Sequence, residues 1–525
     1  MKILAFKPGH DGTVALVDDG RVVFSLESEK DSFPRYGDVT PTVIAEAMQY
    51  CDDIPDVLCI SGWVKGFHSA ERPLDAGYFG WSDEHTIVGE GKIFGRTVTT
   101  FSSTHERSHL MSGYGMAPFA IDEPCYGLVW EGNIGAFYEY GPGGDVRLID
   151  KVMADPGNKY QYAFSLADPT TTAERGGFRY SNAGKLMALA AFGDANVTTP
   201  SENELIEFIL AQDDILRSLK KSDLGSSKFF NIGVDSPEFK SLAASHSQRI
   251  FDRFHDVAAK RLTEGYPLIV SGGCGLNCDW NTLWRTSGLF ADVFVPPVTN
   301  DSGSAVGTAI DAQRHLTGHA KVEWNVYSGA EFRYDVSRIG DPFEFVASGL
   351  EGVAEDLTDG SVIAWVQGRC EIGPRALGHR SLLASATFAD MQERLNAVKG
   401  REGYRPIAPV CREEDVSQYF DWSGASPHML YFQRVNNPEQ IPAVTHVDGS
   451  ARAQTVTEAE NSRLYELLGK VQDHTGVGVL CNTSLNFPGR GFINRTSDLI
   501  EYVLDRRLDG FVLDGDYYRV RVERR

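Results

Sequence analysis

The 525-residue sequence lacks the features that mark a membrane or nucleic-acid-binding protein. No uninterrupted apolar run is long enough to span a bilayer, and the first residues lack the basic and apolar regions of a signal peptide. Basic side chains are scarce, since 50 Lys and Arg stand against 72 Asp and Glu, a formal net charge of -22. Such a charge disfavours binding to nucleic acid or to an anionic membrane. We therefore expect a cytoplasmic protein with neither partner.

Paired cysteines are also missing. The eight cysteines form no CxxC motif, and most lie in apolar or glycine-rich segments. We interpret them as reduced core residues. Cys274 and Cys278 are four residues apart in a glycine-rich turn, a spacing for which we disfavour a metal role.

Length and composition indicate more than one domain. A chain of this length exceeds one compact core, while 42% hydrophobic and 23% charged residues are ordinary for a globular protein. Glycine- and proline-punctuated acidic segments loosen the pattern between 318 and 360. We predict a boundary near residue 340, with domains 1–340 and 341–525. The second alternates short strands and helices and is predicted to be α+β.

A basic loop follows the predicted buried strand 362–366. EIGPRALGHRS, residues 371–381, places Arg375, His379 and Arg380 among glycines and a proline. Guanidinium groups bind phosphate bidentately, and glycines let backbone amides approach its oxygens. For this motif alone, a salt-bridged structural loop is the alternative.

Three later motifs repeat this chemistry. NAVKGREGYRPIAP, THVDGSAR and CNTSLN each adjoin a short predicted strand or helix. Their polar and basic members are Lys399, Arg401, Arg405, His446, Arg452, Asn482 and Ser484. So many basic groups within one part of an acidic chain predict a polyanionic ligand such as a nucleotide or an acyl phosphate.

HxxxH and two carboxylates predict a metal site in the N-terminal half. In THERSHLM, His105 and His109 would lie one helical turn apart on one face. Glu131 and Asp301 each follow an apolar run that we predict to be a strand. The donor set suits iron, manganese or zinc. The alternative is a solvated pair of helix histidines.

Two further segments suggest nucleotide contacts. PLIVSGGCGLNC leads from a predicted strand through Gly272 and Gly273 to Asn277, which begins a helix, and a glycine turn before a helix favours phosphate. Lys185 lies near the start of the predicted helix in SNAGKLMALA. A core helix with a lysine extended to solvent explains Lys185 equally well.

GPRALGHRS, the KxREGxRPxAP block, THVDGSAR and CNTSLN resemble the O-carbamoyltransferases of antibiotic and nodulation-factor biosynthesis. HDGTVAL resembles the entry to the second strand in that family, and the opening resembles its shorter members, which carbamoylate a hydroxymethyl-cephem. The resemblance covers nearly the whole chain and is tightest over 362–486. It implies an N-terminal actin-like (ASKHA) α/β domain followed by a YrdC-like domain.

The resemblance also implies a reaction. The YrdC-like domain would convert carbamoyl phosphate and ATP to carbamoyladenylate, and the N-terminal domain would transfer the carbamoyl group to a hydroxyl of a small-molecule acceptor. We assign catalytic roles to His10, Lys30, Arg375, Arg380, Lys399 and Arg405, with His10 as general base.

The family pattern also implies that His105, His109 and Asp301 bind a metal. We favour iron there and magnesium with ATP. The family has an aspartate where Glu131 stands, so that ligand departs from the pattern.

Two other functions remain open. An ATP-dependent small-molecule kinase on an actin-like fold would form ADP without carbamoyl phosphate. A non-catalytic scaffold for tRNA modification would need localised basic surface that the net charge disfavours. The acceptor, whether a cephem or a sugar hydroxyl, is not set by the sequence. The aromatic stretch 67–81 within the predicted irregular insertion 62–95 is a candidate acceptor wall.

Overall fold

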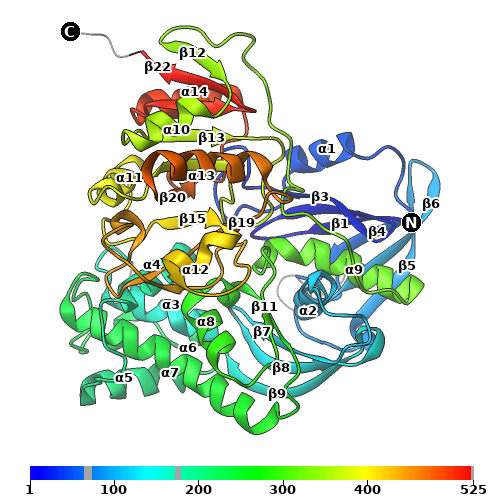
Figure 1. The fold of residues 1–525 in the computed structure, drawn as a ribbon. Coiled ribbons are helices and arrows are strands. Elements are labelled where there is room, and N and C mark those ends of the chain that lie inside the picture. Colours follow the sequence, from blue (N-terminus) through cyan, green and yellow to red (C-terminus); the bar gives the residue numbers. More distant parts are fainter. Residues whose placement is uncertain (64–73, 172–178, 522–525) are drawn as a thin grey trace. The chain divides into compact units, whose positions relative to one another are not determined.

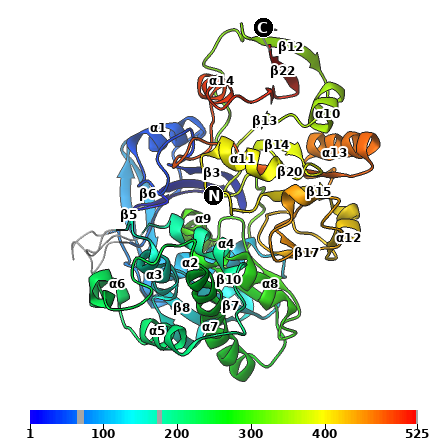
Figure 2. The same cartoon turned by 90° about the vertical axis from the view of Figure 1, so that its left-hand side faces the viewer.

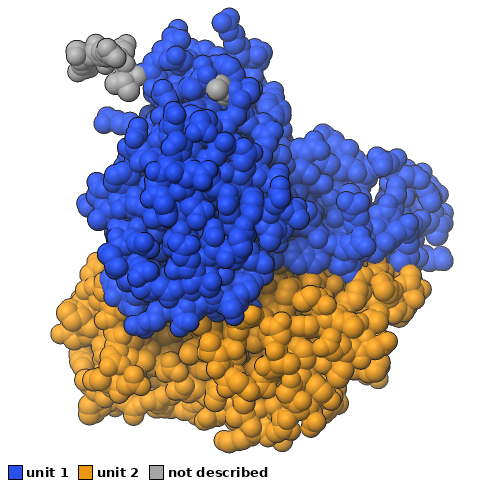
Figure 3. All heavy atoms as spheres, in the orientation of Figure 1, with its two compact units in different colours: residues 1–61, 88–101, 322–525 blue, residues 62–87, 102–321 orange. Residues whose placement is uncertain are grey.

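The computed structural model describes residues 1–63, 74–171 and 179–521, which form two compact units (Figure 3). Unit 1 contains residues 1–61, 88–101 and 322–525, and unit 2 contains residues 62–87 and 102–321. The N-terminal strands therefore share a unit with the C-terminal part of the chain. The predicted domains 1–340 and 341–525 follow chain order and stay a prediction.

Unit 1 opens with a sheet built on a three-stranded antiparallel meander (Figure 1). β4 pairs in parallel with β1, and the strand order is β3-β2-β1-β4-β6-β5. The strands are β1 (Lys2–Lys7), β2 (Thr13–Asp18), β3 (Arg21–Glu27), β4 (Val57–Ser61), β5 (Thr86–Ile93) and β6 (Arg96–Ser103). Helix α1 (Pro41–Gln49) begins where Thr40 caps the backbone amide of Val43.

The strand β5 corrects the prediction of irregular structure over 62–95. Gly89 and Gly91 hide the strand pattern in the sequence. In the structure a Cβ at either position would approach the side chain of Thr100 to 3.2 and 3.0 Å, so the neighbouring strand occupies that space. Residues 64–73 of the predicted insertion, which include the first part of the aromatic stretch 67–81, lie outside the described residues.

The second large sheet of unit 1 has the order β12-β22-β21-β13-β14-β20-β15-β19. Its strands are β12 (Phe343–Ser348), β13 (Ile363–Val366), β14 (Arg380–Ser385), β15 (Ala408–Arg412), β19 (Gln454–Val456), β20 (Val479–Ser484), β21 (Gly510–Leu513) and β22 (Asp516–Val520). Both faces are buried, which explains the continuous apolar run in β13.

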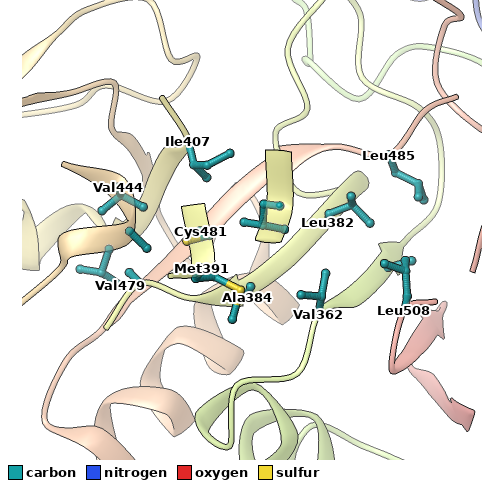
Figure 4. Packing of buried hydrophobic residues seen from close by; sticks show 14 of the residues in the cluster. Val362, Leu382, Ala384, Met391, Ile407, Val444, Val479, Cys481, Leu485 and Leu508 are labelled. Atoms are coloured by element: carbon teal, nitrogen blue, oxygen red, sulfur yellow. The ribbon is translucent and has the colours of Figure 1, made fainter. Parts of the chain in front are cut away.

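Alternate residues of β13 face two different cores. Ile363 and Trp365 pack with residues of α10 (Glu351–Thr358) and α13 (Ser462–Thr475). Ala364 and Val366 pack in the cluster drawn in Figure 4, with residues of α11 (Met391–Lys399) and α14 (Thr496–Asp505). Shorter elements are α12 (Val416–Tyr419) and the small sheet of β16 (Phe420–Asp421), β17 (Gln433–Val435) and β18 (Ser450–Ala451).

Unit 2 contains a sheet of order β11-β10-β7-β8-β9, in which β7, β8 and β9 form an antiparallel meander and β10 pairs in parallel with β7. The strands are β7 (Cys125–Trp130), β8 (Ile134–Tyr140), β9 (Val146–Ala154), β10 (Leu268–Ser271) and β11 (Val293–Phe294). The first four strands of each unit thus share one topology. His10 and Glu131 lie in corresponding loops, each between the first two strands of its meander.

The helices of unit 2 include the two that frame the predicted metal site, α2 and α9, which pack against each other. Figures 1 and 2 show α5 beside α7. The bounds are α2 (His105–Met116), α3 (Pro156–Ala167), α4 (Ser181–Ala190), α5 (Pro200–Leu210), α6 (Ile215–Ser218), α7 (Pro237–Arg261), α8 (Cys278–Thr286) and α9 (Ser304–Thr317).

The molecule is a mixed α/β protein, which confirms the coarse fold prediction. Over residues 1–63, 74–171 and 179–521, no helix combines the length and the apolar character that crossing a membrane requires.

Candidate functional site

Three neighbouring parallel strands of unit 2 end at one edge of their sheet. β7 is followed by Glu131, β10 by Gly272, and β11 leads to Asp301. Gly272 has φ 99°, and a Cβ there would stand 2.5 Å from the carbonyl oxygen of Trp130. Only glycine therefore lets these loops approach. The carboxyl ends of parallel strands are the usual place for a site in such sheets.

His105, His109 and Asp301 converge at this edge. The Nε2 atoms of the two histidines are 3.1 Å apart, and Asp301 Oδ1 lies 3.5 Å from His105 Nε2 and 3.3 Å from His109 Nε2. Ligand atoms about 2.1 Å from one ion, at octahedral to tetrahedral angles, stand about 3.0–3.4 Å apart. The three buried donors therefore fit a divalent metal. Thr104 caps the helix start by accepting a hydrogen bond from the amide of Arg107.

Glu131 does not belong to this group of mutually close donors among the described residues. One of its oxygens accepts a hydrogen bond from the Tyr78 hydroxyl at 3.0 Å, and the other from the Asn133 amide at 2.9 Å. Burial, with the nearby charge of Asp301, raises the pKa of Glu131 to about 8. The ring of Tyr78 lies 4.4 Å from that of His105. Tyr78 therefore connects Glu131 to the site, because its hydroxyl binds Glu131 and its ring packs against His105.

A cluster of basic residues forms in unit 1 from the end of α11, the loop that follows it and the residue after β18. We call Lys399, Arg401, Arg405 and Arg452 the basic cluster. Burial and the charges of Arg405 and Arg452 lower the pKa of Arg401 to about 9. Burial and the neighbouring Arg401 and Arg405 hold the pKa of Lys399 well below its usual range. These cations repel one another, so an anionic ligand would stabilise them.

Lys399 is held by protein acceptors. Its ammonium donates to the backbone oxygen of Ser484, to the Asn486 side-chain oxygen and, at 3.2 Å, to the Asn486 backbone oxygen. It thereby fixes the loop after β20. By contrast, Arg401 Nη2 and Arg452 Nε are buried without a hydrogen-bond partner among the described residues. The donors available to a ligand come from the arginines of the basic cluster.

The loop 371–381 is organised by Glu371, a fully buried carboxylate. Its Oε1 accepts hydrogen bonds from the amides of Leu377, His379 and Arg380 at 2.7, 2.8 and 3.1 Å. Arg375 lies in sequence between Glu371 and the amides that Glu371 binds, and its side chain is half-buried. Glu371 therefore shapes the loop that presents Arg375.

Arg380 and His379 turn into the protein. All five N–H groups of the fully buried Arg380 guanidinium donate to protein oxygens, those of Gln367, Gly368, His379 and Asn494. His379 Nδ1 donates a hydrogen bond to the Arg369 carbonyl at 2.7 Å, and the His379 ring stacks on that of Tyr327 with the ring centroids 3.5 Å apart. A phosphate would have to displace the acceptors of Arg380, so the structure gives it the alternative, structural role.

The other predicted ligands of unit 1 lie along β20 and near β18. Asn482 donates to the Ala376 carbonyl at 3.2 Å and to Gln454 at 2.8 Å, which links β20 to the Arg375 loop. Ser484 donates to Asn486 at 2.6 Å. His446 is buried.

His10 and Lys30 are both placed in unit 1. The carbonyl of His10 accepts a hydrogen bond from the buried Lys7 ammonium at 2.8 Å, which holds the β1–β2 loop. Lys30 is 5% exposed and donates to the Gly373 carbonyl at 2.6 Å. It does not face solvent as a substrate-binding lysine would.

The predicted nucleotide contacts of unit 2 are distributed over two helices. Asn277 caps α8 by accepting from the amides of Asp279 and Trp280 at 3.1 and 3.3 Å. A Cβ at Gly273 would meet open space, so that side of the turn is accessible. Lys185 lies in α4 with its ammonium 5.9 Å from the Phe164 ring centroid.

Two functional residues were not identified from the sequence. Tyr78 lies in the segment predicted to be irregular, where no helical or strand periodicity of apolar residues indicates its position. Glu371 begins the basic motif, and its position six to nine residues before the amides it binds was the available signal.

Family models place this chemistry in context. The "Carbamoyltransferase N-terminus" model matches residues 91–310 and the "Carbamoyltransferase C-terminus" model matches residues 354–519. The chain is 48% identical to the 3'-hydroxymethylcephem-O-carbamoyltransferase of Streptomyces clavuligerus, over 99% of both chains. It is also 48% identical, with the same coverage, to the enzyme of that name from Amycolatopsis lactamdurans. Nodulation protein U of Sinorhizobium fredii is 32% identical over 99% of both chains.

The chain belongs to the carbamoyltransferase family, which confirms the resemblance. Within it, the protein is an O-carbamoyltransferase. Among solved structures, the activator of the 2-hydroxyisocaproyl-CoA dehydratase from Clostridium difficile is 9% identical, covers 60% of this chain and 98% of its own, and has a TM-score of 0.35. A likeness of that size carries no conclusion about fold or ligand.

Proposed function

We propose that the enzyme makes carbamoyladenylate from carbamoyl phosphate and ATP and transfers the carbamoyl group to the hydroxymethyl group of a cephem. The observation that supports the first reaction, formation of carbamoyladenylate, is the basic cluster. Burial and the neighbouring like charges lower the pKa values of Lys399 and Arg401. Among the described residues, Arg401 Nη2 and Arg452 Nε have no hydrogen-bond partner, so these two guanidinium donors remain for a ligand. Phosphate groups are the ligands that such a cluster favours.

The first reaction, formation of carbamoyladenylate, takes place at Arg375 and the arginines of the basic cluster. Water releases phosphate from carbamoyl phosphate as carbamate forms. A carbamate oxygen then bonds to the α-phosphorus of ATP as the bond to pyrophosphate breaks. Arg375, Arg401, Arg405 and Arg452 offset the charge on the transferring groups. Arg380 and Lys399 hold the loops from which those arginines extend.

The second reaction is the transfer. The acceptor hydroxyl oxygen bonds to the carbamoyl carbon, AMP leaves, and His10 takes the hydroxyl proton as general base. His105, His109 and Asp301 would hold a divalent metal, for which we propose iron. When bound, it would supply Lewis-acid polarisation of a phosphate or carbamoyl oxygen. Magnesium would accompany ATP.

We propose the actin-like and YrdC-like assignments as the fold basis of these two reactions. The repeated order of a meander and a parallel strand, β3-β2-β1-β4 and β9-β8-β7-β10, supports a duplicated N-terminal architecture. The eight-stranded sheet, with helix residues packed on both of its faces, supports a second catalytic fold in the C-terminal part of the chain, within unit 1.

The acceptor is proposed from the comparisons. Identity of 48% over 99% of both chains to two proteins named for hydroxymethylcephem exceeds the 32% to nodulation protein U. The test is competition between a 3'-hydroxymethylcephem and a hydroxyl-bearing sugar at equal concentration. We expect the carbamoylated cephem to dominate by at least tenfold, and a preference for the sugar would overturn the assignment.

The test of the two-step reaction follows the products of ATP. We expect pyrophosphate and AMP only when carbamoyl phosphate is present. Arg401→Ala should lower pyrophosphate release at least tenfold, while His105→Ala should spare it and abolish transfer to the cephem. Formation of ADP without carbamoyl phosphate would instead support the small-molecule kinase.

A further inference from the structure

In the segment that begins with Glu27 at the end of β3, residues 27–32 are buried although every one of them is charged or polar. Glu27 and Lys30 are each 5% exposed, and Asp31 and Ser32 are each 6% exposed. Asp31 and Ser32 also have φ angles of 65° and 62°, a conformation unfavourable for side chains other than glycine. Surrounding structure must therefore hold this segment.

The loop 489–495 supplies one side of that support. Ser32 donates its amide to the Phe492 carbonyl at 3.0 Å, and Gly491 donates its amide to the Phe33 carbonyl at 2.9 Å. A Cβ at Gly491 would stand 1.9 Å from the carbonyl oxygen of Glu29, so the two backbones touch. The segment and the loop form one packed layer within unit 1.

The other side is the peptide of Gly373. Glu27 Oε1 accepts from the Gly373 amide at 2.6 Å, and Lys30 Nζ donates to the Gly373 carbonyl at 2.6 Å. The two side chains are themselves 3.6 Å apart. Lys30 Nζ also lies 3.8 Å from the centroid of the Phe492 ring. Opposite charges thus hold both polar backbone groups of one residue in a buried environment, where such contacts are strong.

Gly373 stands two residues before Arg375. Its φ of 85° starts the turn, and the Glu371 carboxylate fixes the far side by binding the amides of Leu377 and His379. The loop is therefore fixed by hydrogen bonds on both sides of Arg375, at Gly373 and at Leu377 and His379. A side chain presented from a loop needs such anchoring to hold its charge in place.

We propose that Glu27 and Lys30 are positioning residues that orient Arg375 for phosphate through the Gly373 peptide. The inference rests on the proposed function in taking Arg375 as a phosphate ligand. It assigns to Lys30 a role without substrate contact. It also makes the N-terminal hairpin part of the adenylate-forming site, although Lys30 and Gly373 are 343 positions apart in sequence.

One test measures the loop itself. Trypsin cleaves after Arg375 only when the loop opens locally. We expect Lys30→Met to increase the rate of cleavage between Arg375 and Ala376 at least tenfold, and Lys30→Arg to restore part of the protection. Lys221→Met is the matched control, since Lys221 is 6% exposed and its ammonium also donates to backbone oxygens, those of Asp168 and Thr171. Equal protection in wild type and Lys30→Met would overturn the inference.

A second test measures coupling in activity. Lys30→Met should raise the KM for carbamoyl phosphate in pyrophosphate release at least tenfold in the wild-type background. It should have less than a twofold effect in Arg375→Ala, because a positioning residue acts only through the residue that it positions. Equal losses in both backgrounds would indicate a general structural role and overturn the proposal.

A folding control accompanies both tests. Lys30→Met alone leaves the charge of Glu27 buried and unpaired, which destabilises the fold. The double variant Glu27→Gln with Lys30→Met leaves no unpaired charge at this pair. We expect this double variant to fold and still to lose protection at Arg375. Retained protection would contradict the proposal. If wild type releases no pyrophosphate with carbamoyl phosphate, the proposed function fails, while the cleavage test still decides the positioning role.

Discussion

Arg107 and Asp311 form a doubly bonded ion pair in which both side chains are buried, with Nε to Oδ2 at 2.5 Å and Nη2 to Oδ1 at 2.7 Å. Arg107 lies between the two histidines on α2, and Asp311 lies on α9, the helix that follows Asp301. The pair therefore joins the helices that carry and adjoin the predicted metal ligands. Its geometry explains why a charged residue occupies the interior of HERSH.

Breaking this pair should destabilise unit 2. Asp311→Asn removes the buried counter-ion of Arg107 and leaves only the more exposed Asp83, 2.7 Å from Nη2. Loss of one partner of a buried ion pair costs up to about 3–5 kcal/mol. Urea unfolding monitored by tryptophan fluorescence measures the change in the free energy of unfolding. The paired variant Arg107→Met with Asp311→Leu should lose less than Asp311→Asn alone. The explanation would be wrong if the double variant were the less stable.

Single substitutions should distinguish the residues that bind the metal from residues that only lie near it. His105→Ala should weaken binding of ferrous iron by about 100-fold or more, since it removes one of three converging donors. Glu131→Gln should weaken binding less than tenfold, because Glu131 contacts Tyr78 and Asn133 instead. Titration of chelator-treated protein, with zinc as a second probe, gives both affinities. Equal losses would place Glu131 among the ligands.

Arg401 and Arg380 should respond in opposite ways to truncation. Arg401→Ala relieves repulsion within the basic cluster, so the melting temperature should stay equal or rise, while stabilisation by added pyrophosphate disappears. Arg380→Ala leaves several buried oxygens without donors and should lower the melting temperature by several degrees or prevent folding. Thermal unfolding with and without pyrophosphate distinguishes them. A pyrophosphate response retained in Arg401→Ala would remove Arg401 from the phosphate site.

His246 should make the enzyme less stable in mild acid. It is fully buried, its Nε2 lies 3.0 Å from the Lys159 carbonyl, and burial lowers its pKa from 6.5 to about 4. The unfolded chain therefore binds the proton first, and stability falls as pH drops from about 6.5 towards 4. The loss is about 2 kcal/mol at pH 5.

His246→Gln should flatten this part of the curve, since glutamine can still donate to Lys159 but does not titrate. Urea unfolding between pH 4.5 and 7.5 compares the two proteins. Parallel curves for wild type and variant would show that His246 does not contribute to the acid sensitivity.

The sequence supported prediction where side-chain chemistry follows from local spacing. HxxxH on a helix brought His105 and His109 to one face, and the loop that follows β11 places Asp301 beside them. The apolar run 362–366 became the buried strand β13. These outcomes depend on helical and strand periods that are visible in the sequence.

Prediction was weaker where a side chain's direction depends on distant segments. Arg380 and Lys399 belong to basic motifs, but carbonyl groups and Asn494 or Asn486 turn them inward. Tyr78 reaches His105 from a segment with no regular period. Lys30 meets Gly373 across most of the chain. No local pattern encodes such long-range acceptors.

The contact between Ser32 and Phe492 sets an order of events during synthesis. The ribosome makes the turn after β3 more than 450 residues before the loop that covers it, counting from the positions of the two residues. Until then, its buried charges and strained backbone lack their partners. The hairpin therefore completes its packing only near the end of translation, which predicts slow final folding and a period of exposure to chaperones.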